Sequence, residues 1–94
     1  MIEYLYNAIR ATAGEDITIT AEITDDNGDC VSNGCALMLW DDEQLLTSVD
    51  GLLIDEIWSF TIPADATTGL TGRYWYCICH HHNKLQFKEP LYLV

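Results

Sequence analysis

The chain has 94 residues, 49% of them apolar, and its 15 acidic and 4 basic residues give a formal net charge of −11. This length supports one thin hydrophobic core, so we predict a single domain over residues 1–94. So few basic side chains cannot neutralise a nucleic-acid backbone, and the same negative field repels anionic lipid headgroups. We therefore expect neither a nucleic-acid partner nor a membrane partner.

The N-terminus lacks the basic start and the apolar run of a signal peptide, and no stretch approaches ~18 continuous apolar residues. We therefore predict no signal peptide, no transmembrane segment and a cytoplasmic location. In that reducing compartment the cysteines Cys30, Cys35, Cys77 and Cys79 are expected to be free thiols. A disulfide between Cys30 and Cys35 across a loop stays open as an alternative.

Period-two alternation, the signal of a β-strand, recurs along the chain from the N-terminus. After a first strand, residues 17–24 alternate isoleucine and alanine with threonine and glutamate. Asp25 to Gly28 follow, and because Asn-Gly tolerates positive φ we predict a tight turn there. Further turns are predicted at 32–34 and at 50–51.

The second half of the chain continues the same pattern. Trp58 and Phe60 alternate with polar residues, and we expect both in the core. A loop over 67–72 precedes a strand in which Tyr74 alternates with Trp75, so that Trp75 is expected on the opposite, exposed face. In chain order, the predicted strands lie near residues 2–9, 17–24, 35–40, 44–49, 54–62, 73–80 and 85–94. The predicted fold class is an all-β antiparallel sandwich of about seven strands.

The segment Leu70-Thr71-Gly72-Arg73-Tyr74-Trp75-Tyr76 resembles the approach to strand F of immunoglobulin-like domains. In those domains a Gly-x-Tyr pattern places a tyrosine at the corner between two strands, where its hydroxyl bonds back to the loop. Tyr74 matches that tyrosine. Tyr76 stands where antibody domains have their second disulfide cysteine, so the resemblance implies an immunoglobulin-like sandwich without the disulfide between the sheets.

The order of the segments "AGEDITITAEITDDNGDCV", "NGCALMLWDD" and "WSFTIPADATTGLTGRYWYCI" is similar to small immunoglobulin-like domains of tailed-phage virion proteins. These include the N-terminal domains of baseplate upper proteins and tail-fibre attachment modules. The likeness covers residues 13–94, but the segment 79–83 replaces the usual acidic-Gly turn. The resemblance implies a non-enzymatic virion or host-cytoplasm protein that assembles with copies of itself or with other virion proteins.

One cluster has the residue types of a metal site. Cys77, Cys79 and His81 would share one strand face, while His80 and His82 would lie on the other. The spacing is not one of the usual zinc patterns, and no second Cys-x-Cys or His-x-His pair is present. We therefore expect no cofactor, and a small metal-stabilised domain stays as a third interpretation. A role for these histidines is not defined by the sequence.

No nucleophile elbow, phosphate-binding loop or dinucleotide fingerprint is present, so we expect no enzyme. The tryptophans and tyrosines exceed what seven short strands must bury, and exposed aromatics favour interfaces and sugar-binding faces. We predict an interaction surface formed by Arg73, Trp75 and Tyr92, with the final strand as an edge that pairs with a neighbour. The alternative function is a carbohydrate- or surface-binding module that uses the exposed aromatics.

Overall fold

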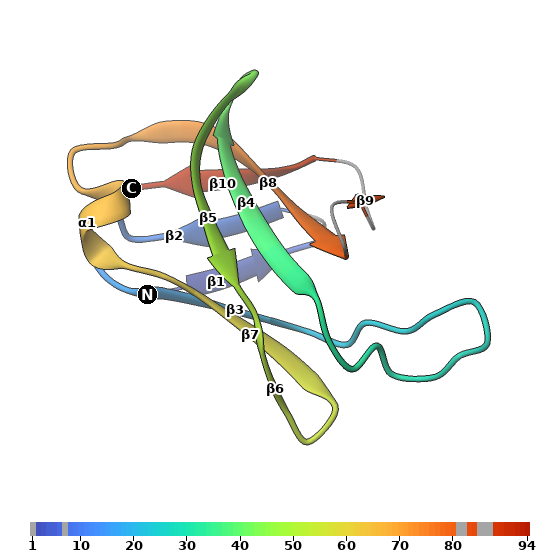
Figure 1. Ribbon diagram of the computed structural model, residues 1–94. Helices are drawn as coiled ribbons and strands as arrows, with labels where there is room; N and C mark the ends of the chain where they lie inside the picture. Colours follow the sequence, from blue (N-terminus) through green and yellow to red (C-terminus); the bar gives the residue numbers. More distant parts are fainter. Residues whose placement is uncertain (1, 7, 81–82, 85–87) are drawn as a thin grey trace.

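Two packed β-sheets form the molecule in a computed structural model that describes residues 2–6, 8–80, 83–84 and 88–94 (Figure 1). The larger sheet has a path of six strands, in which all pairs are antiparallel except β2 with β10, which run parallel. In spatial order its strands are β1 (Ile2–Leu5), β2 (Ala8–Ala11), β10 (Glu89–Leu93), β8 (Gly72–His80), β4 (Cys35–Asp41) and β5 (Gln44–Asp50).

The smaller sheet contains β3 (Ile17–Ala21), β7 (Ile57–Ile62) and β6 (Leu52–Ile54), in that order. A short strand, β9 (Asn83–Lys84), pairs with the end of β8 beside the larger sheet. One helical turn, α1 (Ala64–Thr67), follows β7. A mostly-β fold of two packed sheets, as in a β-sandwich, agrees with the predicted fold class. The described chain has ten strands where about seven were predicted, and β2 and β10 pair parallel where only antiparallel pairs were predicted.

The apolar residues of the alternating segments meet between the two sheets. Trp58 and Phe60 are buried as predicted, and their rings stack with centroids 6.2 Å apart. The Trp58 indole donates a hydrogen bond to the carbonyl of Val31 at 2.8 Å, so its polar edge is satisfied inside the core. The other buried core residues are Ile9, Ala11, Ile17, Ile19, Ile23, Val31, Cys35, Leu37, Leu39, Ile62, Tyr76, Ile78, Leu91 and Leu93.

Two of the predicted strands are each interrupted by a turn that the sequence analysis did not predict. The predicted strand 2–9 is divided into β1 and β2, which pair antiparallel and are joined where Tyr6 has a φ of +64°. The predicted strand 54–62 is also divided. Its first residue, Ile54, ends β6, and Asp55 and Glu56 adopt positive φ and reverse the chain, so that β7 begins at Ile57. Each segment contains apolar residues on both sides of the turn, so its composition alone indicated a continuous strand.

At Asp50-Gly51 a turn was predicted, but the chain does not reverse there. It crosses from one sheet to the other. The chain leaves β5 in the larger sheet and enters β6 in the smaller one with only Gly51 between them. The Gly51 N–H donates to the carbonyl of Cys35 at 2.9 Å, which holds the crossing point against β4. Residues 44–54 therefore follow one side of both sheets.

The turn predicted at Asp25 to Gly28 is confirmed. The Gly28 N–H donates to the Asp25 carbonyl at 3.0 Å, and Gly28 has a φ of +83°. The Asp25 carboxylate also accepts bonds from the backbone N–H groups of Asn27 and Asp29. The strand before this loop ends at Ala21, short of the predicted Thr24, which makes only an isolated bridge to Cys30.

The last strand is not an edge, contrary to the prediction. β10 lies between β2 and β8, so both of its sides are hydrogen-bonded within the sheet. Its predicted start at residues 85–87 lies outside the described part of the chain. Among the described strands, β1 and β5 end the path of the larger sheet, β3 and β6 end the smaller one, and β9 pairs with β8 alone. Within the same residues, no helix has the length and apolar character needed to cross a membrane.

Candidate interaction surface

The three residues predicted to form an interaction surface lie together on the outer face of the larger sheet. Arg73 and Tyr92 are directly opposite each other on β8 and β10, and Trp75 is opposite Pro90 on the same two strands. Because side chains two apart on a strand share a face, Arg73 and Trp75 form one surface with Tyr92. Arg73 and Tyr92 are exposed.

Trp75 is half-buried, not exposed as predicted. The Arg73 guanidinium lies 5.1 Å from the centre of its ring, within the range of a cation–π interaction. On its other side Trp75 is opposite Trp40 of β4, which is also half-buried. The two rings therefore form an aromatic strip across β8 and β4.

Two basic residues that the sequence did not indicate join this surface. The Lys88 ammonium lies 4.2 Å from the centre of the Trp40 ring and donates to the carbonyl of Asp42 at 3.0 Å. Arg10 of β2 is opposite Tyr92, on the side away from Arg73. Both arginines of the chain therefore flank Tyr92 in one row across three strands, which no sequence periodicity could reveal because the strand order is not sequential.

The surface has acidic neighbours as well. Glu3 on β1 forms a 4.0 Å ion pair with Arg10, and both side chains are about half exposed. The acidic turn 41–43 between β4 and β5 borders the Lys88 side. Exposed ion pairs of this kind contribute little to stability. The surface therefore has mixed charge and exposes polar groups around two covered indole rings.

The predicted metal-site residues Cys77 and Cys79 are both buried under the same outer face. The Trp40 indole donates to the Cys77 sulfur at 3.4 Å, and the Cys79 thiol contacts the Met38 sulfur at 3.7 Å. His81 and His82 lie outside the described residues. Among the residues that are described, no three His, Cys, Asp or Glu side chains are grouped closely enough to hold a metal ion.

His80 and the remaining cysteines lie at the end of the sheet. His80 is half-buried and is directly opposite Cys35 on β4, with its side chain on the core-facing side. Cys30 and Cys35 are free thiols, so the alternative of a disulfide between them is not realised. Burial raises the pKa of the Cys35 thiol, and the nearby Cys30 raises it further.

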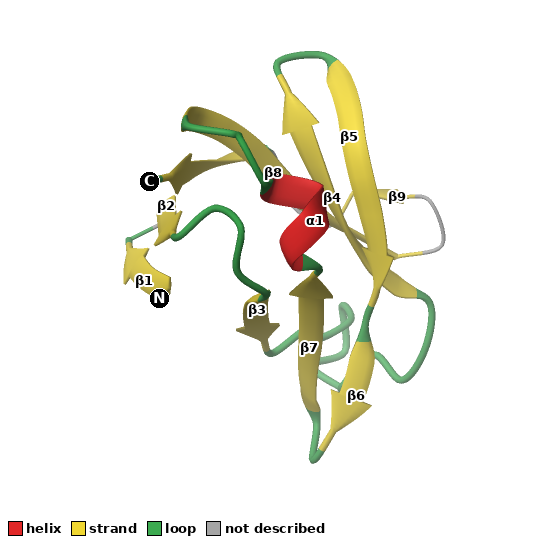
Figure 2. Ribbon diagram, turned by 90° about the vertical axis from the view of Figure 1, so that its left-hand side faces the viewer, coloured by secondary structure: helices red, strands yellow, loops and turns green. Residues whose placement is uncertain are grey.

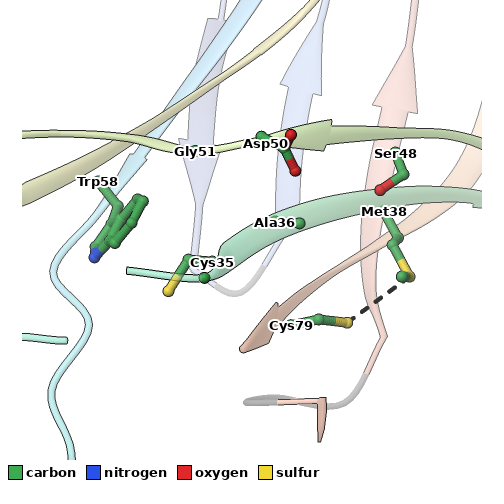
Figure 3. A pocket seen from close by; sticks show the side chains of 9 residues that line it. Cys35, Ala36, Met38, Ser48, Asp50, Gly51, Trp58 and Cys79 are labelled. Atoms are coloured by element: carbon green, nitrogen blue, oxygen red, sulfur yellow. Dashed lines mark hydrogen bonds between the residues drawn. The ribbon is translucent and has the colours of Figure 1, made fainter. Parts of the chain in front are cut away.

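A cavity of about 360 Å³ opens near the point where the chain crosses between the sheets (Figure 3). Its polar side chains, Ser48 and Asp50, come from β5, and the Cys79–Met38 sulfur contact also lies in its lining, with Met38 beside Ser48. A second cavity of about 310 Å³ lies at the acidic end, between the 25–29 loop and the turn at Asp55 and Glu56. Neither of these two cavities is lined by Arg73, Trp75 or Tyr92, so the predicted interaction surface lies away from both.

The Tyr74 side chain is half-buried and packs against the core. In the part of the chain that the structure describes, its hydroxyl makes no hydrogen bond, so the bond expected at a tyrosine corner is not among its contacts.

Comparisons with models of known protein families, with curated proteins and with solved structures give no match.

Proposed function

We propose that this chain is an immunoglobulin-like β-sandwich that serves as a non-enzymatic assembly component of a phage or prophage virion. The order of the strands supports the immunoglobulin-like part. If β3, β7 and β6 are strands B, E and D, then β10, β8, β4 and β5 occupy the places of G, F, C and C′. The virion part rests on the likeness of the segments between residues 13 and 94.

The observation that best supports an assembly role is the shared outward face of Arg73, Trp75 and Tyr92. Aromatic and arginine side chains are enriched at protein interfaces because they combine large contact area with polar groups at the edge. In this face the long side chains of Arg73 and Lys88 are already held over the indole rings of Trp75 and Trp40. The surface would therefore lose little side-chain freedom when a partner subunit covers it.

A sugar-binding role would use the free faces of aromatic rings. Here Arg73 lies over the Trp75 ring and Lys88 lies over the Trp40 ring, so neither indole presents an open platform on that side. Tyr92, at 38% exposed, is the most accessible ring of the face. This arrangement favours contact with a protein over stacking on a sugar.

Native mass spectrometry of the untagged protein in reducing buffer tests the proposal. We expect a metal-free symmetric oligomer such as a trimer or hexamer, because closed symmetry is the usual outcome of self-association in a structural protein. Replacing Arg73 and Tyr92 with serine should dissociate it, while replacing the exposed loop residues Ser32 and Thr71 with alanine should not. A monomer at every concentration would contradict self-assembly, and a monomer with one bound metal ion would favour the metal-stabilised alternative.

A further inference from the structure

We infer that copies of this chain join head to tail, with the β1 edge of one copy pairing with the β5–β6 edge of the next. This contact rests on the proposed assembly role but uses surfaces separate from the Arg73, Trp75 and Tyr92 face. The two edges lie on opposite sides of the sandwich, with β1 on the left and β5 and β6 on the right of Figure 2. A contact between them therefore leaves a free edge on each copy for the next one.

The exposed apolar side chains concentrate at these two edges. Eight large hydrophobic residues are exposed among those described, and six of them belong to β1 with its turn or to the stretch 44–54. Tyr6 is fully exposed, and Leu52 and Ile54 are 62% and 57% exposed. The six residues are Tyr4, Leu5, Tyr6, Leu45, Leu52 and Ile54.

The backbone at both edges is available for pairing. Within the described chain, β1 pairs only with β2, β5 only with β4, and β6 only with β7, so each has one open side. The β3 edge differs, because the Tyr4 side chain of β1 reaches it, and the backbone N–H of Thr20 donates to the Tyr4 hydroxyl at 3.2 Å. An added strand at an open edge gains main-chain hydrogen bonds, and side-chain contacts then select the partner.

Both edges lack the side chains that usually prevent pairing, although β1 and β6 are only four and three residues long, and short edge strands also limit pairing. Monomeric sheet proteins protect edge strands with lysine, proline or inward-pointing charges. The segments 2–6 and 44–54 contain no lysine, arginine or proline, and their only charged residues are Glu3 and Asp50. Glu3 is already paired with Arg10, which leaves the β1 edge close to neutral.

Charge disfavours a contact between two copies of the stretch 44–54. Acidic turns flank the stretch 44–54 at both ends, at residues 41–43 and at Asp55 and Glu56. Two such edges facing each other would place these carboxylates close together, and like charges across a strand pair are destabilising. The near-neutral β1 edge does not add to this repulsion. A contact between the β1 edge and the 44–54 edge avoids this repulsion. It is heterologous, so it generates a ring if the rotation closes and a filament if it does not.

Two charge variants test the contact by complementation. The first, Leu5→Lys with Tyr6→Lys, blocks the β1 edge, and the second, Leu52→Lys with Ile54→Lys, blocks the β5–β6 edge. The control, Ser32→Lys with Thr71→Lys, adds the same charge at exposed loop positions away from both edges. Circular dichroism melting checks that each variant folds, and sedimentation velocity measures self-association.

Each edge variant alone should associate at least about ten-fold more weakly than the wild type, and the control should associate like the wild type. In an equimolar mixture of the two edge variants, copies of different variants should associate more tightly than copies of the same variant, because each variant retains the edge that the other lacks. Wild-type association by both edge variants would overturn the inference, and so would a mixture that stays monomeric. If only the variant at Arg73 and Tyr92 dissociates the oligomer, the edge contact is wrong and the proposed assembly function stands.

Discussion

Gly51 shows how one residue determines the relation between the two sheets. A Cβ at this position would lie 2.5 Å from Cε3 of Trp58 and 2.6 Å from Cε1 of Phe60. Both rings are buried in the core and are stacked on each other, so neither can move away freely. Glycine therefore lets the chain cross from β5 to β6 directly over the ring pair. The dipeptide Asp-Gly predicted a turn here, because it carries no information on the Trp58 and Phe60 side chains of β7, the strand that pairs with β6 and packs over this position.

We expect Gly51→Ala to destabilise the protein by about 1–3 kcal/mol, the usual cost of forcing an extra carbon into a packed core. Urea unfolding followed by tryptophan fluorescence measures this change, because Trp58 is part of the contact. The double variant with Trp58→Phe removes one of the two clashing groups and should lose less than the sum of the two single variants. A Gly51→Ala protein as stable as the wild type would show that the chain can shift away from the rings without cost.

At the scale of the elements, alternation identified the strands whose two faces differ and missed the turns inside apolar segments. β3 and β7 were located because Ile19 and Phe60 alternate with exposed or half-buried polar residues. The strand β8 is buried on both faces from Tyr76 to Cys79, since Trp40 and Met38 cover its outer side. The alternation of residues could predict which face a residue occupies there, but it could not predict that both faces are covered.

The turn between β6 and β7 stores a conformational cost that a substitution can remove. Asp55 and Glu56 have φ values of +51° and +67°, the combination that two-residue hairpins reserve for Asn-Gly. Asp55→Asn with Glu56→Gly should therefore stabilise the domain by about 1 kcal/mol and raise Tm by about 4–8 °C. The matched control, Asp55→Asn with Glu56→Gln, removes the same charges but keeps a side chain at the second position. Equal melting temperatures for the two variants would attribute any gain to charge and not to backbone conformation.

At the scale of the whole molecule, the sequence predicted three residues of the outer face, Arg73, Trp75 and Tyr92, but neither its other members nor its arrangement. Arg73 and Trp75 could be assigned to one strand by inspection, because they are two residues apart. Arg10, Lys88 and Trp40 reach the same face only through the spatial order β2, β10, β8 and β4, which joins segments from both ends of the chain. Long-range pairing of this kind leaves no local signal, so the covering of both indole rings could not be predicted.

The net charge of −11 provides a last test of how the copies hold together. Two such molecules repel each other, and raising the ionic strength from about 0.01 M to about 0.15 M shortens the Debye length from about 30 Å to about 8 Å. If apolar edges and backbone hydrogen bonds make the contact, salt screens only the repulsion, and self-association should strengthen severalfold. If attraction between Arg73 and partner carboxylates makes it, the same salt should weaken association. Sedimentation velocity at the two ionic strengths distinguishes the two kinds of contact. The variant Arg73→Ser should lose the weakening by salt only if Arg73 makes the contact.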